Sequence, residues 1–157
     1  MSEKVKVMGN AEEEKDVEQI ARAISRLLKY EASIKKGEYR YDIYLLDRAD
    51  PADKKEYLVA YLIPKKDETT GYPYYEMFLF YNVFLPAYMN RGVLPISKYH
   101  LKPEMMPKDP EIQFLTLLGL MSPIVEGMKS YLENFEITHS EVGEISFILY
   151  LKKQPHA

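Results

Sequence analysis

The first periodic segment predicts an amphipathic helix that begins at Asn10 and ends before Gly37. Asn10 is a good N-cap residue, and Glu13 follows three positions later, as in a capping box. Lys35 and Lys36 fit the last turn, and Gly37 is a typical C-terminal stop. Apolar residues at helical spacing form one stripe, which consists of Val17, Ile20, Ala21, Ile24, Leu27, Leu28 and Ile34.

Three strand-like runs follow the helix, at residues 38–46, 56–63 and 74–85. The connecting segments are rich in Pro, Asp, Thr and Gly, which favour turns. Because both connections are short, the three strands are predicted to pair as an antiparallel meander.

The third run is unusually aromatic, because eight of the seventeen residues from Tyr72 to Tyr88 are Tyr or Phe. A strand with rings on both faces is expected to be covered on both sides. We predict that helices cover Phe78, Phe80 and Phe84, and that another layer covers Tyr75, Met77, Leu79 and Tyr81. The flanking tyrosines are expected to be exposed contact residues, since Tyr is enriched at interfaces; they are Tyr72, Tyr74 and Tyr88.

A proline-rich segment from Pro86 to Pro110 follows, and its five prolines predict a long irregular excursion over the surface. Asp109 and Pro110 then resemble the cap and first residue of a helix. This helix is apolar nearly all round as far as Met121, which predicts deep burial.

A second cap-and-start signal at Ser122 and Pro123 predicts either a second short helix or one kinked helix, continuing to Phe135. The final strand, Glu144–Leu151, is predicted to pair antiparallel with the first or third strand. The whole pattern predicts an α+β fold in one domain, residues 10–153, with tails at residues 1–9 and 154–157.

The composition narrows the possible chemistry. The chain has no cysteine, which excludes disulfides, thiol catalysis and cysteine-ligated metals. Its net charge of −3 provides no global basic field for nucleic acid. No secretory signal and no apolar run long enough for a membrane span are visible, so a cytoplasmic protein without membrane contact is expected. The abundance of Glu, Lys, Tyr and Ile resembles thermophile usage.

Metal and cofactor sites are not indicated. His100, His139 and His156 are far apart in sequence and form no metal-binding motif. Asp47, Asp50 and Asp53 recur every three residues, but this spacing is better explained by a turn than by a cation loop. Glycine-rich phosphate loops and serine nucleophile elbows are missing, so no cofactor is predicted.

One weak catalytic pattern pairs Asp42 in the first strand with Glu56 at the start of the second. Two such acids are typical of metal-dependent nucleases. The lysine expected two residues after the glutamate is replaced by Leu58, so the pattern is incomplete.

Lysines and tyrosines form a broader candidate site. A meander with the last strand added would gather lysines and tyrosines at one end of the sheet, as a nucleic-acid groove requires. Solvated strand ends are the simpler explanation, since acidic residues lie nearby. The candidate binding residues are Lys35, Lys36, Lys65, Lys66, Lys152, Lys153, Tyr39, Tyr72 and Tyr74.

Three functional hypotheses follow from these patterns. The first is a non-catalytic binding or accessory protein that contacts a protein partner, or a second copy, through exposed tyrosines and residues 86–110. The second is nucleic-acid binding at the lysine–tyrosine end of the sheet. The third is a metal-dependent nuclease that uses Asp42 and Glu56.

Overall fold

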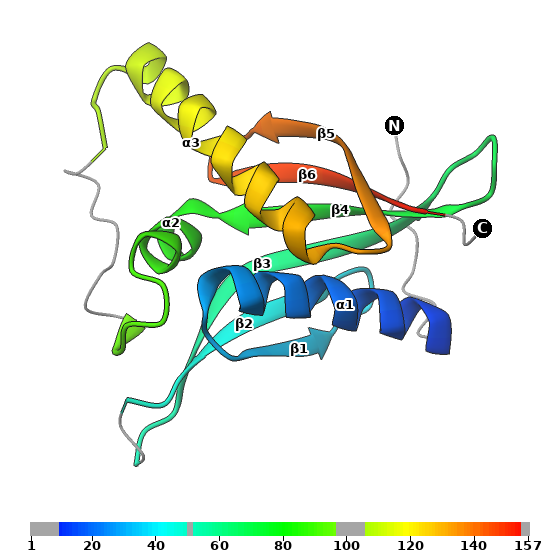
Figure 1. The fold of residues 1–157 in the computed structure, drawn as a ribbon, viewed down its shortest axis with the longest axis horizontal. Coiled ribbons are helices and arrows are strands. Elements are labelled where there is room, and N and C mark those ends of the chain that lie inside the picture. The colour runs from blue at the N-terminus through cyan, green and yellow to red at the C-terminus, as the bar shows by residue number, and fades with distance from the viewer. Residues whose placement is uncertain (1–9, 50–51, 97–105, 155–157) are drawn as a thin grey trace.

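The computed structural model describes residues 10–49, 52–96 and 106–154, which form three helices and one six-stranded antiparallel sheet (Figure 1). The sheet order is β1-β2-β3-β4-β6-β5. The predicted α+β fold is confirmed, because an N-terminal helix precedes a meander and the C-terminal strand joins the sheet beside the third predicted strand. The elements are α1 (Ala11–Leu28), β1 (Ala32–Lys36), β2 (Tyr41–Asp47), β3 (Lys55–Lys66), β4 (Pro73–Phe80), α2 (Tyr81–Met89), α3 (Pro110–Tyr131), β5 (Phe135–Val142) and β6 (Ser146–Lys153).

Some predicted features lie outside the described residues. They are the tail at residues 1–9, the end of the C-terminal tail, the middle of the proline-rich segment at residues 97–105, Asp50, His100 and His156. Among the described residues, none of the helices combines the length and apolarity needed to cross a bilayer.

The start of α1 agrees with its sequence signal, but its end does not. Asn10 caps the helix by accepting a hydrogen bond of 2.7 Å from the backbone N–H of Glu13. The helix ends at Leu28 and not near Gly37, because Lys29 takes a left-handed conformation with φ 61°. Tyr30 then ties the turn to the segment after α2, since its hydroxyl, with one proton to donate, lies 2.8 Å from the carbonyl oxygen of Asn90 and 2.7 Å from that of Val93.

Residues predicted to be the last turn of that helix form the edge strand β1. Ile34 pairs with Ile43 of β2 and packs, partly buried, against the hydrophobic core. Its side chain therefore contacts the core from a strand and not from the last turn of a helix. Gly37 lies in the connecting turn, where its N–H donates to the carbonyl of Arg40. A Cβ at Gly37 would lie 3.0 Å from that oxygen, so the turn leaves little room for a side chain.

The two faces of the sheet differ. Helices α1 and α3 lie across one face (Figure 1), and the strand residues that point towards them are buried. In β4 these residues are Tyr75, Met77 and Leu79. Phe78 and Phe80 point to the outer face and are half-buried, so the prediction that helices cover them is wrong.

The aromatic run changes from strand to helix inside the predicted strand. It becomes α2 at Tyr81, whose hydroxyl donates to the carbonyl of Gly143. Phe84 is buried as part of this helix, and Pro86 lies within the helix too. The proline-rich segment therefore begins inside a helix, and the predicted irregular structure is wrong as far as Met89. Pro86 and Ala87 are buried, whereas Met89 is exposed.

The predicted helices after Asp109 form the single helix α3, which contains Pro123 and ends at Tyr131. Phe135 begins strand β5 instead of continuing the helix. The prediction of deep burial for the first turns of α3 is wrong, because of its residues 110–121 only Leu117 and Met121 are buried.

Candidate protein interface

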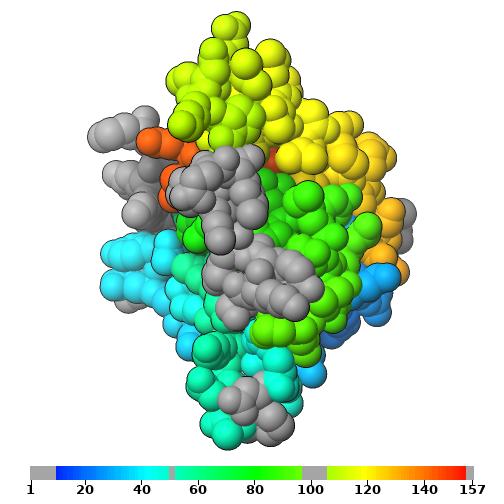
Figure 2. All heavy atoms as spheres, turned by 90° about the vertical axis from the view of Figure 1, so that its left-hand side faces the viewer, coloured from blue at the N-terminus to red at the C-terminus, as the bar shows by residue number. Residues whose placement is uncertain are grey.

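The first turns of α3 expose large apolar side chains to solvent. Figure 2 shows these turns projecting at the top of the molecule, above α2. We call the exposed set the α3 ridge; it consists of Ile112 (53% exposed), Phe114 (48%), Leu115 (58%) and Leu118 (42%).

The ridge follows from helical geometry. The buried side of α3 is formed by Leu117, Met121, Ile124 and Met128, which recur at spacings of three and four residues. Leu115 and Leu118, also three residues apart, therefore lie on a different side of the helix. The first half of the helix is therefore apolar on two sides, and packing within the chain buries only one of them.

The chemistry of the ridge is that of an interface core. Residues 112–125 include no charged residue, and depletion of charge is typical of the buried centre of interfaces. A Cβ added at Gly119 would meet no atom within 4 Å, so the helix surface is open there. A second helix is able to approach the backbone closely at this position.

An apolar groove lies on the far side of the same turns, with a volume of about 770 Å³. It lies between α3, the start of α2, the β5–β6 turn and the outer face of the sheet. Exposed Ile145 of the turn is on its rim. Its other apolar lining includes Tyr57, Leu58, Phe80, Tyr81 and Val83.

The opposite end of the sheet carries the predicted lysines. Strands β3 and β6 end there in the pairs Lys65–Lys66 and Lys152–Lys153, beside the start of β4. Strand β1 ends four register positions earlier, since Lys36 aligns through Tyr41 with Leu62 of β3. Its Lys35 reaches back to Glu56 at the start of β3, so the structure does not bring Lys35 to this end. We call this the lysine end. In its register, Tyr74 pairs with both Lys65 and Lys152.

Carboxylates oppose most of these lysines. Lys65 Nζ lies 2.5 Å from Glu76 Oε1 on the outer face, with side-chain exposures of only 11% and 14%. Lys35 pairs with Glu56 at 2.7 Å. On the helix side of the sheet, Lys36 pairs with Glu14, and Lys153 pairs with Glu12 and Asp16. The positive charge of the lysine end is therefore largely cancelled within the chain.

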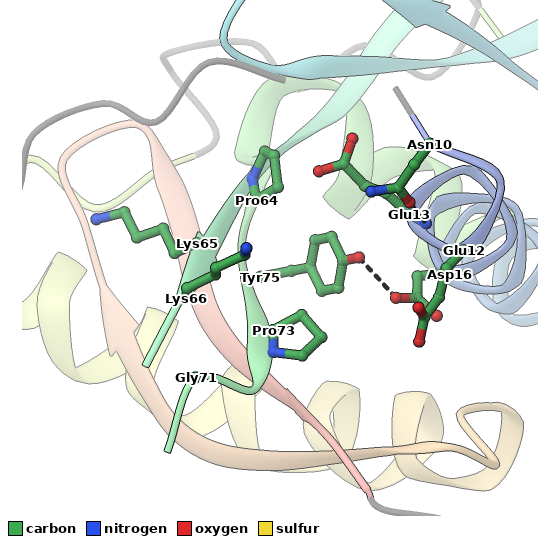
Figure 3. A pocket seen from close by; sticks show the side chains of 10 residues that line it. All are labelled: Asn10, Glu12, Glu13, Asp16, Pro64, Lys65, Lys66, Gly71, Pro73 and Tyr75. Atoms are coloured by element: carbon green, nitrogen blue, oxygen red, sulfur yellow. Dashed lines mark hydrogen bonds between the residues drawn. The ribbon is translucent and has the colours of Figure 1, made fainter. Parts of the chain in front are cut away.

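A polar cavity of about 240 Å³ separates α1 from the sheet at this end (Figure 3). The Tyr75 hydroxyl points across it and donates to Asp16 Oδ2 at 2.7 Å. Lys153 Nζ lies 3.1 Å from the other oxygen of Asp16. Burial, and then the hydrogen bond to Asp16, raises the pKa of Tyr75. These contacts hold the first helix against the last strand.

The predicted tyrosines separate into two groups. Tyr72 and Tyr74 line a shallow hollow of about 360 Å³ together with Tyr150, His139 and Lys152. Tyr39 is also exposed, in the β1–β2 turn. Tyr88 belongs to α2, is half-buried and stacks on Phe84, so it is not the fully exposed contact residue that the sequence predicts.

The candidate nuclease acids are each paired with a base. Asp42 lies 2.8 Å from the Arg40 guanidinium, and Glu56 is paired with Lys35. In the strand register, Asp42 of β2 lies opposite Tyr61 of β3, whereas Glu56 lies opposite Leu46, four residues further along β2. Within the described part of the chain, no cluster of His, Asp and Glu has the arrangement of a metal site.

Two other predicted acid and histidine positions have local roles. Asp47 is buried, and its carboxylate accepts from the backbone N–H groups of Ala49 and Ile96. His139 is exposed and contacts Glu141 at 2.9 Å. The turn explanation of Asp47 therefore agrees with its contacts.

No protein-family model matches the chain, and neither a curated protein nor a solved structure is significantly similar to it. The sequence pattern does not indicate the α3 ridge as a site, because an uncharged helix of this kind predicts burial in the core.

Proposed function

We propose that this chain is a non-catalytic binding protein that recognises a protein partner through the α3 ridge. The observation that carries the proposal is the exposure of four large apolar side chains in an uncharged, projecting stretch of helix. Water contact with such a cluster costs free energy that a partner recovers by covering it.

The form of the surface favours a helical or apolar protein segment over a small polar ligand. Leu115 and Leu118 form a narrow row flanked by Ile112 and Phe114, as in the anchor pattern of helices that bind partner grooves. The open backbone at Gly119 allows close contact along that row.

Nucleic-acid binding at the lysine end is less well supported. Counterion release requires phosphates to replace mobile ions around free cations, but Lys35, Lys65 and Lys153 already have carboxylate partners. Base stacking requires accessible ring faces. Tyr39 and Tyr72 are exposed and meet this requirement, whereas the ring of Tyr61 on the outer face is covered by Phe78 and by the guanidinium of Arg40.

Site-directed photo-crosslinking tests the proposal. A photoreactive phenylalanine analogue is introduced at Leu115 and, as a control, at exposed Lys129 near the other end of α3. In cells that naturally express the chain, we expect a discrete protein adduct from position 115 and none from position 129.

A second substitution makes the result specific to the ridge. Leu118→Asp is expected to abolish the adduct, because it places a charge in the contact row. Thr116→Asp lies in the same turns but outside the row, and it should leave the adduct intact. Equal labelling at positions 115 and 129, or an adduct insensitive to Leu118→Asp, would refute the proposed function.

A further inference from the structure

We infer that the occupant of the α3 ridge is a second copy of this chain, which docks through an antiparallel pair of α3 helices. The inference rests on the proposed function, since it names the partner of the same surface. Three observations carry it: the residue order of the ridge, its position at the end of the molecule, and its lack of charge.

The residue order makes the ridge self-complementary. In an antiparallel pair centred between Leu115 and Leu118, Leu115 of each copy meets Leu118 of the other, as a two-fold axis requires. Glu111 then lies opposite Ser122 and not opposite another acid. On one side of this seam, Ile112 of each copy lies above Gly119 of the other, where no side chain blocks its approach.

The position of the ridge makes such a pair possible. Only the projecting first half of α3 takes part, and the remainder of each helix packs on α1 and β5 of its own copy (Figures 1 and 2). An antiparallel arrangement directs the two sheets away from one another, to opposite ends of the pair.

The charge distribution also favours self-association at this place. The chain has a net charge of −3, so two copies repel each other over most approaches. Residues 112–125 are uncharged, so two copies can make apolar contact there. The acidic first turn of α1 lies at the opposite end of the sheet and takes no part in this contact. Stable dimers bury about 800 Å² per partner, and four half-exposed side chains offer less, so a reversible dimer is expected.

Sedimentation velocity of the purified chain over a wide concentration range is the first test. We expect the weight-average mass to rise from monomer towards dimer, and Leu118→Asp to keep the chain monomeric at every concentration. Gly119→Leu should also weaken the dimer at least tenfold. It should leave the monomer folded, because the position is open in the monomer.

Cysteine crosslinking tests the register, because the natural chain has no cysteine to give background. Under mild oxidation, a mixture of Leu115→Cys and Leu118→Cys chains should form the mixed disulfide faster than either variant links to itself. A matched mixture of Thr116→Cys and Lys129→Cys chains should not link.

The outcomes separate this inference from the proposed function. A chain that is monomeric at all concentrations, or crosslinking without preference for the 115–118 pair, overturns the second copy as occupant. If photo-crosslinking at Leu115 still gives an adduct that Leu118→Asp abolishes, the binding function stands with a different protein as partner. If that adduct is missing as well, both fail.

Discussion

The two ends of the sheet differ in whether their side chains find partners within the chain. At the lysine end, charged and polar groups find partners within the chain, as Lys65 does with Glu76 and Tyr75 does with Asp16. At the other end, Leu115 and Leu118 of the α3 ridge remain in contact with solvent. At the lysine end, most of the charged groups thus have partners within the chain. At the other end, the exposed leucines of α3 have no apolar cover among the described residues.

Two neighbouring leucines of α3 give the sharpest form of this comparison. Leu117→Ala should lower the free energy of unfolding by about 2–4 kcal/mol, because Leu117 is buried and its loss leaves a cavity. Leu118→Ala should change it by less than about 0.5 kcal/mol in the monomer, because Leu118 is exposed. Urea unfolding at low protein concentration measures both. Equal losses would mean that the ridge is part of the core.

Alkaline pH should destabilise the fold through two buried tyrosines, Tyr75 at the lysine end and Tyr81 at the start of α2. Burial raises the pKa of Tyr75, and burial also raises the pKa of Tyr81 to about 12. Tyrosines in the unfolded chain titrate at about pH 10, so the folded state binds the two phenol protons more tightly. Stability is therefore complete below about pH 10 and falls as the pH rises towards the folded pKa values.

Removing one phenol should make that fall less steep. Tyr75→Phe should reduce the slope of unfolding free energy against pH by up to about 1.4 kcal/mol per pH unit. Met77→Leu, a buried change of similar volume in the same strand, should keep the original slope. Urea titrations between about pH 9 and pH 12 supply the slopes. An unchanged slope in Tyr75→Phe would contradict the assigned role.

Adjacent lysines at the end of β3 test whether the lysine end is structural. Lys65→Met should cost about 1–3 kcal/mol, because it leaves Glu76 without its partner in a nearly covered position. Lys66→Met, at an exposed position, should stay within about 0.5 kcal/mol of the natural chain. Thermal unfolding at neutral pH compares the two variants. Similar losses of stability in both variants would show that the Lys65–Glu76 ion pair does not stabilise the fold.

The smallest expected effect concerns nucleic acid. We expect no salt-sensitive binding of single-stranded DNA or RNA oligonucleotides at physiological ionic strength, as measured by fluorescence anisotropy. If binding is observed and the double change Lys66→Glu, Lys152→Glu abolishes it while Lys129→Glu does not, the comparison between the two ends must be reversed.

The sequence predicted those parts of the fold that have a local cause. The cap at Asn10 and the meander depend on neighbouring residues, and both appear as expected. Strand β1 was hidden because Ile34 fits a helical stripe as well as it fits a strand, and the left-handed Lys29 that separates them has no glycine signal.

The candidate site was harder to predict for a different reason. An apolar residue pattern reports which side chains avoid water, but it does not report whether the same chain or another one covers them. For Leu117 the cover is internal, whereas for Leu115 the structure offers none among its described residues. Only the tertiary arrangement separates these two cases.

The sheet order also has a consequence for synthesis on the ribosome. Of the six described strands, β6 is synthesised last, yet it lies between β4 and β5. Until its residues emerge, β5 has no neighbour in the sheet, and Asp16 in the first helix lacks Lys153 from the last strand. Contacts between residues so far apart in the chain form slowly. The nascent chain therefore reaches its native state only after release of nearly its full described length, and the apolar turns of α3 are already present during that interval.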